Sequence, residues 1–292
     1  MTVSLGFVGV YAVLIGVASF MERPLSRGVH AVQLNVLIRG GSLATAAVAV
    51  LAVHGLALPS VPSVLAGLGI GLITGIGSIF YCFALGYLPV SLVVTFSNLY
   101  LVVTILLGIV LLREPVTVLK LAGLATTLAG VLLLSQVPAR YGVHAEAAGH
   151  SKTVSIRAVG LLAAYIVLIG IAAFLEKPAL RGLDATQLNA LMAVSMAALG
   201  GIVLAVHGPP LRITKRTLGG FGVGAMIGLA SVFYFLGLRD LPISIAAAAS
   251  SGSVVVTVML SAVVLHQPLT GVRSGAIGLT VIGVVLLALS AG

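Results

Sequence analysis

Hydroxyl and amide side chains recur at helical spacing inside long apolar stretches of this sequence. Ser78 and Tyr81 are about one helical turn apart in one stretch, and Ser231 and Tyr234 repeat that spacing in another. Two further apolar stretches contain polar residues at similar spacing. The polar residues of the four stretches are Ser78, Tyr81, Ser97, Asn98, Tyr100, Ser231, Tyr234, Ser250, Ser251 and Ser253. Residues three or four apart share one face of a helix. Such faces can hydrogen-bond a small solute, so these residues are our candidates for a substrate-binding cavity.

A structural role fits the same residues. A serine or threonine in a membrane helix can bond a carbonyl of its own helix or a side chain of a neighbouring one, and an interhelical bond is worth about 0.6–2 kcal/mol. Tyr81, Asn98, Tyr100 and Tyr234 are bulkier or carry more donors, so they favour the cavity more than the serines do. The sequence leaves both interpretations open.

Three charged residues lie in or beside the apolar stretches. Glu22 and Glu176 each lie near the end of a stretch, followed by a basic residue and a proline. They are either interfacial carboxylates or groups that couple to protons or act in gating. Arg39 lies well inside its stretch. A charge at the bilayer centre costs at least about 2.5–3.5 kcal/mol, so Arg39 either extends to the interface or meets an anion in the cavity.

Motifs for several other chemistries are absent from the sequence. It contains no Walker loop, no HExxH zinc motif and no GxSxG, which argues against ATP-driven pumping and hydrolysis. We therefore expect no enzymatic activity, no cofactor and no metal. Cys82 is the only cysteine, so an intrachain disulfide is excluded.

Composition places these residues in a membrane. Hydrophobic residues make up 60% of the chain and charged residues 7%, and the mean hydropathy is +1.26. A soluble domain carries about 25% charged residues. The formal net charge of +9 is spread over short connections without a basic stripe, which argues against a nucleic-acid partner. We expect an integral membrane protein surrounded by the lipid bilayer.

Ten apolar segments are long enough to cross a bilayer, which takes about 20 residues. They are 3–21, 31–53, 63–85, 90–112, 117–136, 157–175, 185–206, 217–238, 243–265 and 271–290. The longest polar stretch separates the fifth segment from the sixth. We predict an all-α membrane protein with ten transmembrane helices: a five-helix repeat at 1–136, a linker loop at 137–156 and a second five-helix repeat at 157–292.

The two repeats are copies of one unit. Residues 11–38 recur without a gap at 165–192, and more than half of the positions are identical. Matching glycine rows predict that a neighbouring helix approaches closely; they are Gly67, Gly71 and Gly75 in one copy and Gly220, Gly224 and Gly228 in the other. Because five is odd, the second copy must enter the membrane from the opposite side. This predicts an inverted repeat with both termini on one side.

Several of these features together resemble the drug/metabolite transporter superfamily, EamA type. They are the twofold unit, the Leu88-Pro89 turn before the fourth segment, the LREPVT stretch at 112–117 and the glycine-containing last segment of each repeat. The resemblance covers nearly the whole chain. It implies an inverted-repeat fold with a central cavity lined by the third, fourth, eighth and ninth segments. It also implies cytoplasmic termini, which we adopt, although the distribution of lysine and arginine favours the other side.

The chain departs from the small multidrug-resistance branch of that superfamily. That branch carries a carboxylate midway along the first segment and a tryptophan in the fourth. Here residues 13–16 contain no acid, and Ser97 stands at the tryptophan position. A cavity without a carboxylate or an aromatic box would hold lipophilic cations poorly.

Together with the resemblance, the sequence predicts a secondary transporter. We expect it to export a small polar metabolite, such as an amino acid, by alternating access across the cell (inner) membrane. The alternatives are a transporter or exchanger of nucleotide-sugar-like or phosphate-bearing solutes, and a non-transporting membrane scaffold. The expected partners are the small-molecule substrate and lipid, and the oligomeric state is left open.

Overall fold

The chain is helical throughout the part that the computed structural model describes, which is residues 2–26, 30–55, 59–88, 93, 96–136, 156–208, 214–264 and 271–290. The helices are α1 (Thr2–Ser26), α2 (Ala31–His54), α3 (Val61–Tyr87), α5 (Tyr100–Leu111), α6 (Val118–Gln136), α7 (Ile156–Ala179), α8 (Ala185–His207), α9 (Lys215–Asp240), α10 (Ile243–Ser250), α11 (Gly252–Val264) and α12 (Gly271–Ser290). Those ranges contain no strand, so the predicted all-α class is confirmed. All but the last residue of the predicted linker, 137–156, lies outside the described residues.

Among the described residues, seven helical segments are long and apolar enough to cross a membrane. One of them, Ile243–Val264, consists of α10 and α11 together. Three shorter apolar helical segments accompany the seven: Tyr100–Leu111, Val118–Leu134 and Ser274–Ser290. A helix satisfies its backbone hydrogen bonds internally, so apolar helices of this kind are suited to hydrocarbon.

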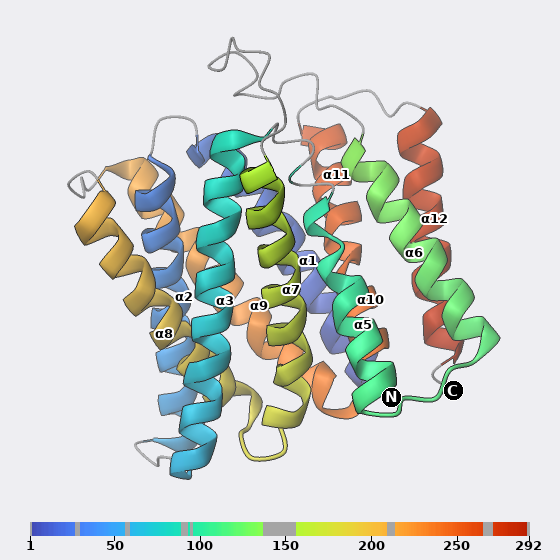
Figure 1. Cartoon of the computed structure of the whole chain (residues 1–292), viewed down its shortest axis with the longest axis horizontal. Helices are drawn as coiled ribbons and strands as arrows, with labels where there is room; N and C mark the ends of the chain where they lie inside the picture. The colour runs from blue at the N-terminus through green and yellow to red at the C-terminus, as the bar shows by residue number, and fades with distance from the viewer. Residues whose placement is uncertain are drawn as a thin grey trace.

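Helices of the first repeat pack mainly against helices of the second (Figure 1). α1 packs against α9 and α11, and its counterpart α7 packs against α3 and α5. Likewise α2 packs against α9, and α8 packs against α3. The counterparts α6 and α12 stand together at the right of Figure 1, and α2 and α8 stand at the left. The packing of one repeat is thus reproduced by the other.

The bundle has two distinct edges. α1 begins and α12 ends at the bottom of Figure 1, which we call the terminal edge. α6 ends and α7 begins at the top of Figure 1, which we call the linker edge. The two ends of each repeat therefore lie at opposite edges.

The glycine rows bring the repeats into close contact, as the sequence predicted. Gly71 of α3 lies against Met192 of α8, and Gly224 of α9 lies against Ile38 of α2. A β-carbon on either glycine would overlap backbone atoms of the facing helix. Glycine is therefore required at these positions by the approach of two backbones.

A matched pair of hydrogen bonds joins the repeats deeper in the bundle. Thr104 Oγ1 of α5 donates to the carbonyl of Gly170 at 3.1 Å, and Thr257 Oγ1 of α11 donates to the carbonyl of Gly16 at 3.0 Å. Both threonines are buried. These bonds hold α5 on α7 and α11 on α1, and they occupy corresponding positions of the two repeats.

We expect Gly224→Ala to destabilise the protein, whereas Gly222→Ala on the same helix should not. The added β-carbon at Gly224 meets the Ile38 carbonyl, so α9 and α2 must separate, at a cost of about 1–3 kcal/mol. A β-carbon at Gly222 has no heavy atom within 4 Å, and alanine is the better helix former by about 1 kcal/mol. Thermal unfolding in detergent, followed by size-exclusion chromatography, measures the difference. Equal midpoints for the two variants would contradict this packing.

Two helices break at matching positions, which the periodicity did not indicate. The ninth predicted segment divides into α10 and α11 at Ser251, and α5 begins only after a turn that contains Asn98. These two residues are counterparts in the duplication. The Ser251 amide bonds the Ala248 carbonyl, three residues back, at 3.2 Å, and the Ser251 hydroxyl donates to the same carbonyl. A side chain that competes for backbone partners, followed by Gly252, accounts for the break in the second repeat.

Candidate functional site

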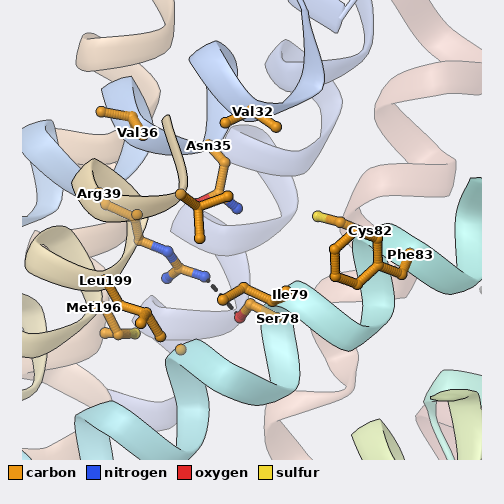
Figure 2. A pocket seen from close by; sticks show the side chains of 13 residues that line it. Val32, Asn35, Val36, Arg39, Ser78, Ile79, Cys82, Phe83, Met196 and Leu199 are labelled. Atoms are coloured by element: carbon orange, nitrogen blue, oxygen red, sulfur yellow. Dashed lines mark hydrogen bonds between the residues drawn. The ribbon is translucent and has the colours of Figure 1, made fainter. Parts of the chain in front are cut away.

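A pocket of about 70 Å³ lies between α2, α3 and α8 (Figure 2). Its polar lining is Asn35 and Arg39 from α2 and Ser78 from α3. The remaining lining is apolar or carries a thiol: Val32, Val36, Gly75, Ile79, Cys82, Phe83, Met196, Leu199, Gly200 and Val203. One charged group among apolar walls and a few polar groups is a common composition for a small-molecule site.

The Arg39 guanidinium is directed toward α3 (Figure 2). Its Nη2 donates to Ser78 Oγ at 3.1 Å, and that hydroxyl donates in turn to the Thr74 carbonyl at 2.9 Å. The hydroxyl proton of Ser78 is therefore used within α3, and its oxygen is free to accept from the guanidinium. Arginine has five N–H donors, so this bond fixes its direction and leaves donors for another acceptor.

Other polar groups surround Arg39 at electrostatic range. They are Glu22 from α1, Cys82 from α3 and Tyr165 from α7. Tyr81 of α3 and Cys82 also lie within electrostatic range of Glu22. Arg39 and Glu22, which the sequence suggested for separate roles, therefore lie within electrostatic range of each other.

A row of tyrosines continues from this site through the bundle. Tyr81 and Tyr165 form a ring pair with centroids 5.1 Å apart, and Tyr11 and Tyr234 form a second pair at 4.9 Å. Tyr100 lies within electrostatic range of Tyr11 and of Tyr165, so it links the two pairs. The five rings come from α3, α7, α1, α9 and α5. They place a row of polar groups, made of two ring pairs with Tyr100 in electrostatic range of both, inside an apolar bundle.

The two carboxylates have unlike surroundings. Glu176 lies within electrostatic range of the second tyrosine pair and of Tyr100. Glu22 lies within electrostatic range of Arg39, whose counterpart in the second repeat is Ala193. Lys177 follows Glu176 directly, but its Nζ donates to the carbonyls of Leu238, Arg239 and Leu241 at 2.6, 2.8 and 2.8 Å. Both repeats therefore carry the glutamate, as Glu22 and Glu176, but only the first repeat carries the cation, Arg39.

Several predicted cavity residues bond their own helices. Ser231 Oγ donates to the Ile227 carbonyl at 3.0 Å, Ser250 Oγ to the Ala247 carbonyl at 2.7 Å, and Ser251 Oγ to the Ala248 carbonyl. This is the structural role that the sequence left open for serines. Their part in a cavity stays a prediction, as does the lining by the third, fourth, eighth and ninth segments.

The remaining predicted residues lie at the helix breaks. Ser97 is half-buried at the helical residue before the break, Asn98 is half-buried in the turn before α5, and Ser253 is half-buried at the start of α11. The Ser253 carbonyl accepts from Thr257 Oγ1 at 2.9 Å. Of the predicted substrate-binding set, the pocket of Figure 2 brings together Arg39 and Ser78.

Sequence reasoning missed three groups of this site. Tyr11 and Tyr165 are identical positions of the duplicated unit, and the identity of a large polar residue in both copies was a usable signal. Asn35 lines the pocket one turn before Arg39. Nothing in the described ranges brings three or more histidine, cysteine, aspartate or glutamate side chains together as a metal site would require.

Comparison with known proteins agrees with the fold and the duplication. The model of the EamA-like transporter family matches residues 3–136 and again residues 156–289. One solved structure, described only as a protein crystal structure, superposes with a TM-score of 0.82 at 18% identity, covering 100% of this chain and 98% of its own. No curated protein sequence matches the chain. Because the family model covers both halves, the protein is a multi-pass integral membrane protein that belongs to the EamA-like transporter family.

Proposed function

We propose that the protein is a secondary transporter that exports a small polar metabolite, an amino acid or a related compound, by alternating access. The observation that carries this proposal is the interior row of polar groups, which runs from Arg39 and Glu22 through five tyrosines to Glu176. A scaffold has no use for a set of partly buried polar groups that cost free energy in hydrocarbon. A polar solute that passes through the bundle can form a hydrogen bond or an ion pair with each of these groups.

The broken helices support a site in the same region. Transporters commonly bind their substrates where membrane helices are interrupted, because the freed backbone groups and helix ends become ligands. Here the interruptions fall at the counterparts Asn98 and Ser251. Each repeat therefore supplies one interrupted helix to the interior.

The proposal includes ten membrane spans in two inverted five-helix repeats, with both termini cytoplasmic. The reciprocal packing of the repeats supports it, and so does the placement of the two ends of each repeat at opposite edges (Figure 1). In this arrangement the seven long segments and the three shorter ones are all spans.

Cysteine labelling tests this topology. In a Cys82→Ala background, we expect Ala145→Cys and Ala291→Cys to react with a membrane-impermeant maleimide from opposite sides of the membrane. The reason is the odd number of spans between the termini and the linker. Right-side-out and inside-out vesicles distinguish the two sides. Labelling of both from the same side would rule out the inverted repeat.

A substrate screen tests the transport activity. Purified protein in liposomes is offered labelled amino acids, apolar carboxylates, nucleotide sugars and sugar phosphates, each with and without a proton gradient. The second candidate is a phosphate-bearing solute, which the Arg39 guanidinium in the pocket also suits because arginine binds phosphate and carboxylate alike. Uptake of none of these would favour the scaffold.

A further inference from the structure

We infer that the pocket of Figure 2 is an open gate at the linker edge, and that it closes when α3 moves against α2 and α8, so that Asn35 and Gly75 make the contacts that Asn189 and Gly228 make in the second repeat. This inference rests on the proposed inverted repeats and transport function, and it deepens that function by naming the gate. Corresponding residues of inverted repeats lie at opposite edges, so a contact at one closed edge is a template for its counterpart when the other edge closes.

The seam between α8 and α9 is closed in the structure. Asn189 Nδ2 of α8 donates to the Gly228 carbonyl of α9 at 2.9 Å, and Asn189 is buried. The two helices also pack against each other. α8 begins at the terminal edge, and Asn189 lies within its first two turns (Figure 1). This hydrogen bond therefore holds the bundle closed on the side of the terminal edge.

The counterpart seam, between α2 and α3, is open. Asn35 and Gly75, the counterparts of the bonded pair, both line the pocket. Among the described residues no hydrogen bond joins these two, and no interface like that of α8 with α9 joins α2 to α3. Arg39 reaches across the seam instead and donates to Ser78 Oγ at 3.1 Å, whereas the counterpart of Arg39 is the short Ala193. α2 begins and α3 ends at the linker edge, so the opening lies on that side (Figure 1).

The glycine rows locate the point where α3 departs from α8. A β-carbon on Gly71 would lie 2.6 Å from backbone atoms of α8, so the two helices touch there. One turn nearer the linker edge, a β-carbon on Gly75 would find its nearest backbone atom of α8 at 3.8 Å. The counterpart Gly228 stays in contact, since a β-carbon there would lie 2.6 Å from the Ser42 carbonyl oxygen of α2. α3 therefore diverges from α8 after Gly71, whereas α9 stays against α2.

The exposure of matched side chains follows the same pattern. Cys82 lines the pocket and is half-buried, whereas its counterpart Phe235 on α9 is 3% exposed. Phe83 is 52% exposed, and its counterpart Leu236 is half-buried. Closure of the gate should therefore bury Cys82. Because Cys82 is the only cysteine of the chain, one native thiol reports the state of the gate.

Alanine at Gly75 and alanine at Gly228 should have opposite effects on this gate. In the open gate, the atom closest to a β-carbon on Gly75 is Leu199 Cδ2 at 2.8 Å, the end of a flexible side chain. In the closed gate that β-carbon would meet the backbone of α8, as a β-carbon on Gly228 meets the backbone of α2 here. Gly75→Ala should therefore hold the gate open, and Gly228→Ala should favour its closure. Asn189→Ala should also favour closure, because it removes the bond that holds the opposite edge closed.

Alkylation of Cys82 by N-ethylmaleimide tests these expectations in purified protein, at one pH and without substrate. Asn189→Ala should slow the reaction roughly threefold, which is the shift in equilibrium expected from the loss of one interhelical bond. Gly228→Ala should slow it about fivefold or more, because overlap with a backbone is the larger penalty. Gly75→Ala should react at least as fast as the wild type. Size-exclusion chromatography checks that each variant is folded.

Thr257→Ala is the matched control. The Thr257 hydroxyl bonds the Gly16 carbonyl of the other repeat, but Thr104 makes the equivalent bond to Gly170. A bond that both repeats make at once does not distinguish an open edge from a closed one. Thr257→Ala should therefore lower the thermal midpoint and leave the rate of alkylation unchanged.

A double variant separates a shift of the gate from a general loss of stability. In Asn189→Ala combined with Gly75→Ala, the closed gate is blocked by the added β-carbon, so the fast alkylation of Cys82 should return. A second substitution would not restore the rate if Asn189→Ala only loosened the fold.

Three results would overturn the inference. They are wild-type alkylation rates in both Asn189→Ala and Gly228→Ala, slower alkylation in Gly75→Ala, and a double variant as slow as Asn189→Ala alone. Asn189→Ala keeps the comparison valid if Gly228→Ala fails to fold. Failure of the transport proposal looks different: the alkylation rates would change as expected, while liposomes would take up none of the solutes screened. For a solute that is transported, Gly75→Ala should reduce the rate at least tenfold although Cys82 stays reactive.

Discussion

Lys120→Met should lower the free energy of unfolding by about 3 kcal/mol, because it leaves a buried carboxylate without its cation. Lys120 Nζ lies 3.0 Å from Glu114 Oε2 and also donates to the Pro115 carbonyl at 3.2 Å. The exposed fractions of the two side chains are 4% for Lys120 and 8% for Glu114. Water therefore cannot replace the lost ion pair. The thermal midpoint in detergent, measured by size-exclusion chromatography after heating, reports the loss.

Glu114 also accepts hydrogen bonds from α10, and these bonds determine how much stability is lost in Lys120→Met. Its carboxylate accepts from the Ile243 amide at 2.5 Å, from the Ser244 amide at 3.4 Å and from the Ser244 hydroxyl. These groups form the N-terminus of α10, where backbone donors lack helical partners and a negative charge is favoured. The carboxylate keeps these bonds in Lys120→Met. We therefore expect a cost at the lower end of the range for breaking a buried pair, which is about 3–5 kcal/mol.

A double variant distinguishes the effect of breaking the ion pair on stability from the effect of removing the lysine side chain. Glu114→Gln with Lys120→Met removes both charges and retains acceptors and donors at α10, so it should recover part of the stability lost in Lys120→Met. Lys215→Met, at the exposed start of α9, is the matched control and should change stability by less than about 0.5 kcal/mol. If Lys120→Met is as stable as Lys215→Met, the buried pair contributes nothing.

These contacts also close the terminal edge of the bundle. Glu114 ties the α5–α6 connection to α10, Lys177 ties α7 to the last carbonyls of α9, and Ser4 Oγ bonds Asp240 Oδ2 at 2.8 Å. Under the proposed alternating access, these bonds must be released when the site opens toward that edge. Lys120→Met leaves the Glu114 cap in place, so its effect on stability should exceed its effect on transport.

The fold was largely predictable because its determinants are local or repeated. The lengths of the apolar segments predicted helices, and the duplication predicted which helices of the two repeats correspond to each other. The glycine rows at Gly71 and Gly224 were predictable contacts because a missing side chain on a helix face has one plain consequence, the close approach of a neighbour. The identity of that neighbour was not predictable, because periodicity describes a face and says nothing about which helix covers it.

The same limit applies to the site. Ser78 was found from its spacing, but its partner Arg39 lies on another helix, and the wall from α8 is purely apolar and carries no polar signal. The serines at 231, 250 and 251 keep helical spacing whether they face a cavity or bond their own carbonyls. Glu114 was quoted only as part of a motif, since its partners at 243 and 244 are remote in sequence.

Tyr81→Ala, Tyr234→Ala and Asn98→Ala should each impair transport by roughly five- to 150-fold without loss of expression. Loss of a substrate hydrogen bond in a buried site costs about 1–3 kcal/mol, which gives that range of affinity. Each tyrosine variant also removes a ring pair. Tyr81→Ala removes the pair with Tyr165, and Tyr234→Ala removes the pair with Tyr11. Initial rates in liposomes, over a range of concentrations of the substrate found by screening, measure the effect.

Phenylalanine variants separate the hydroxyl from the ring. Tyr81→Phe and Tyr234→Phe keep the paired rings and remove only the hydrogen-bonding group, so a site role predicts that transport falls while the thermal midpoint stays near the wild type. Thr126→Ala is the control, because Thr126 is half-buried on α6, away from the tyrosines, and donates to the Ala122 carbonyl of its own helix at 2.6 Å. Full transport by both phenylalanine variants and by Asn98→Ala would show that the row of tyrosines serves packing and that the solute passes elsewhere.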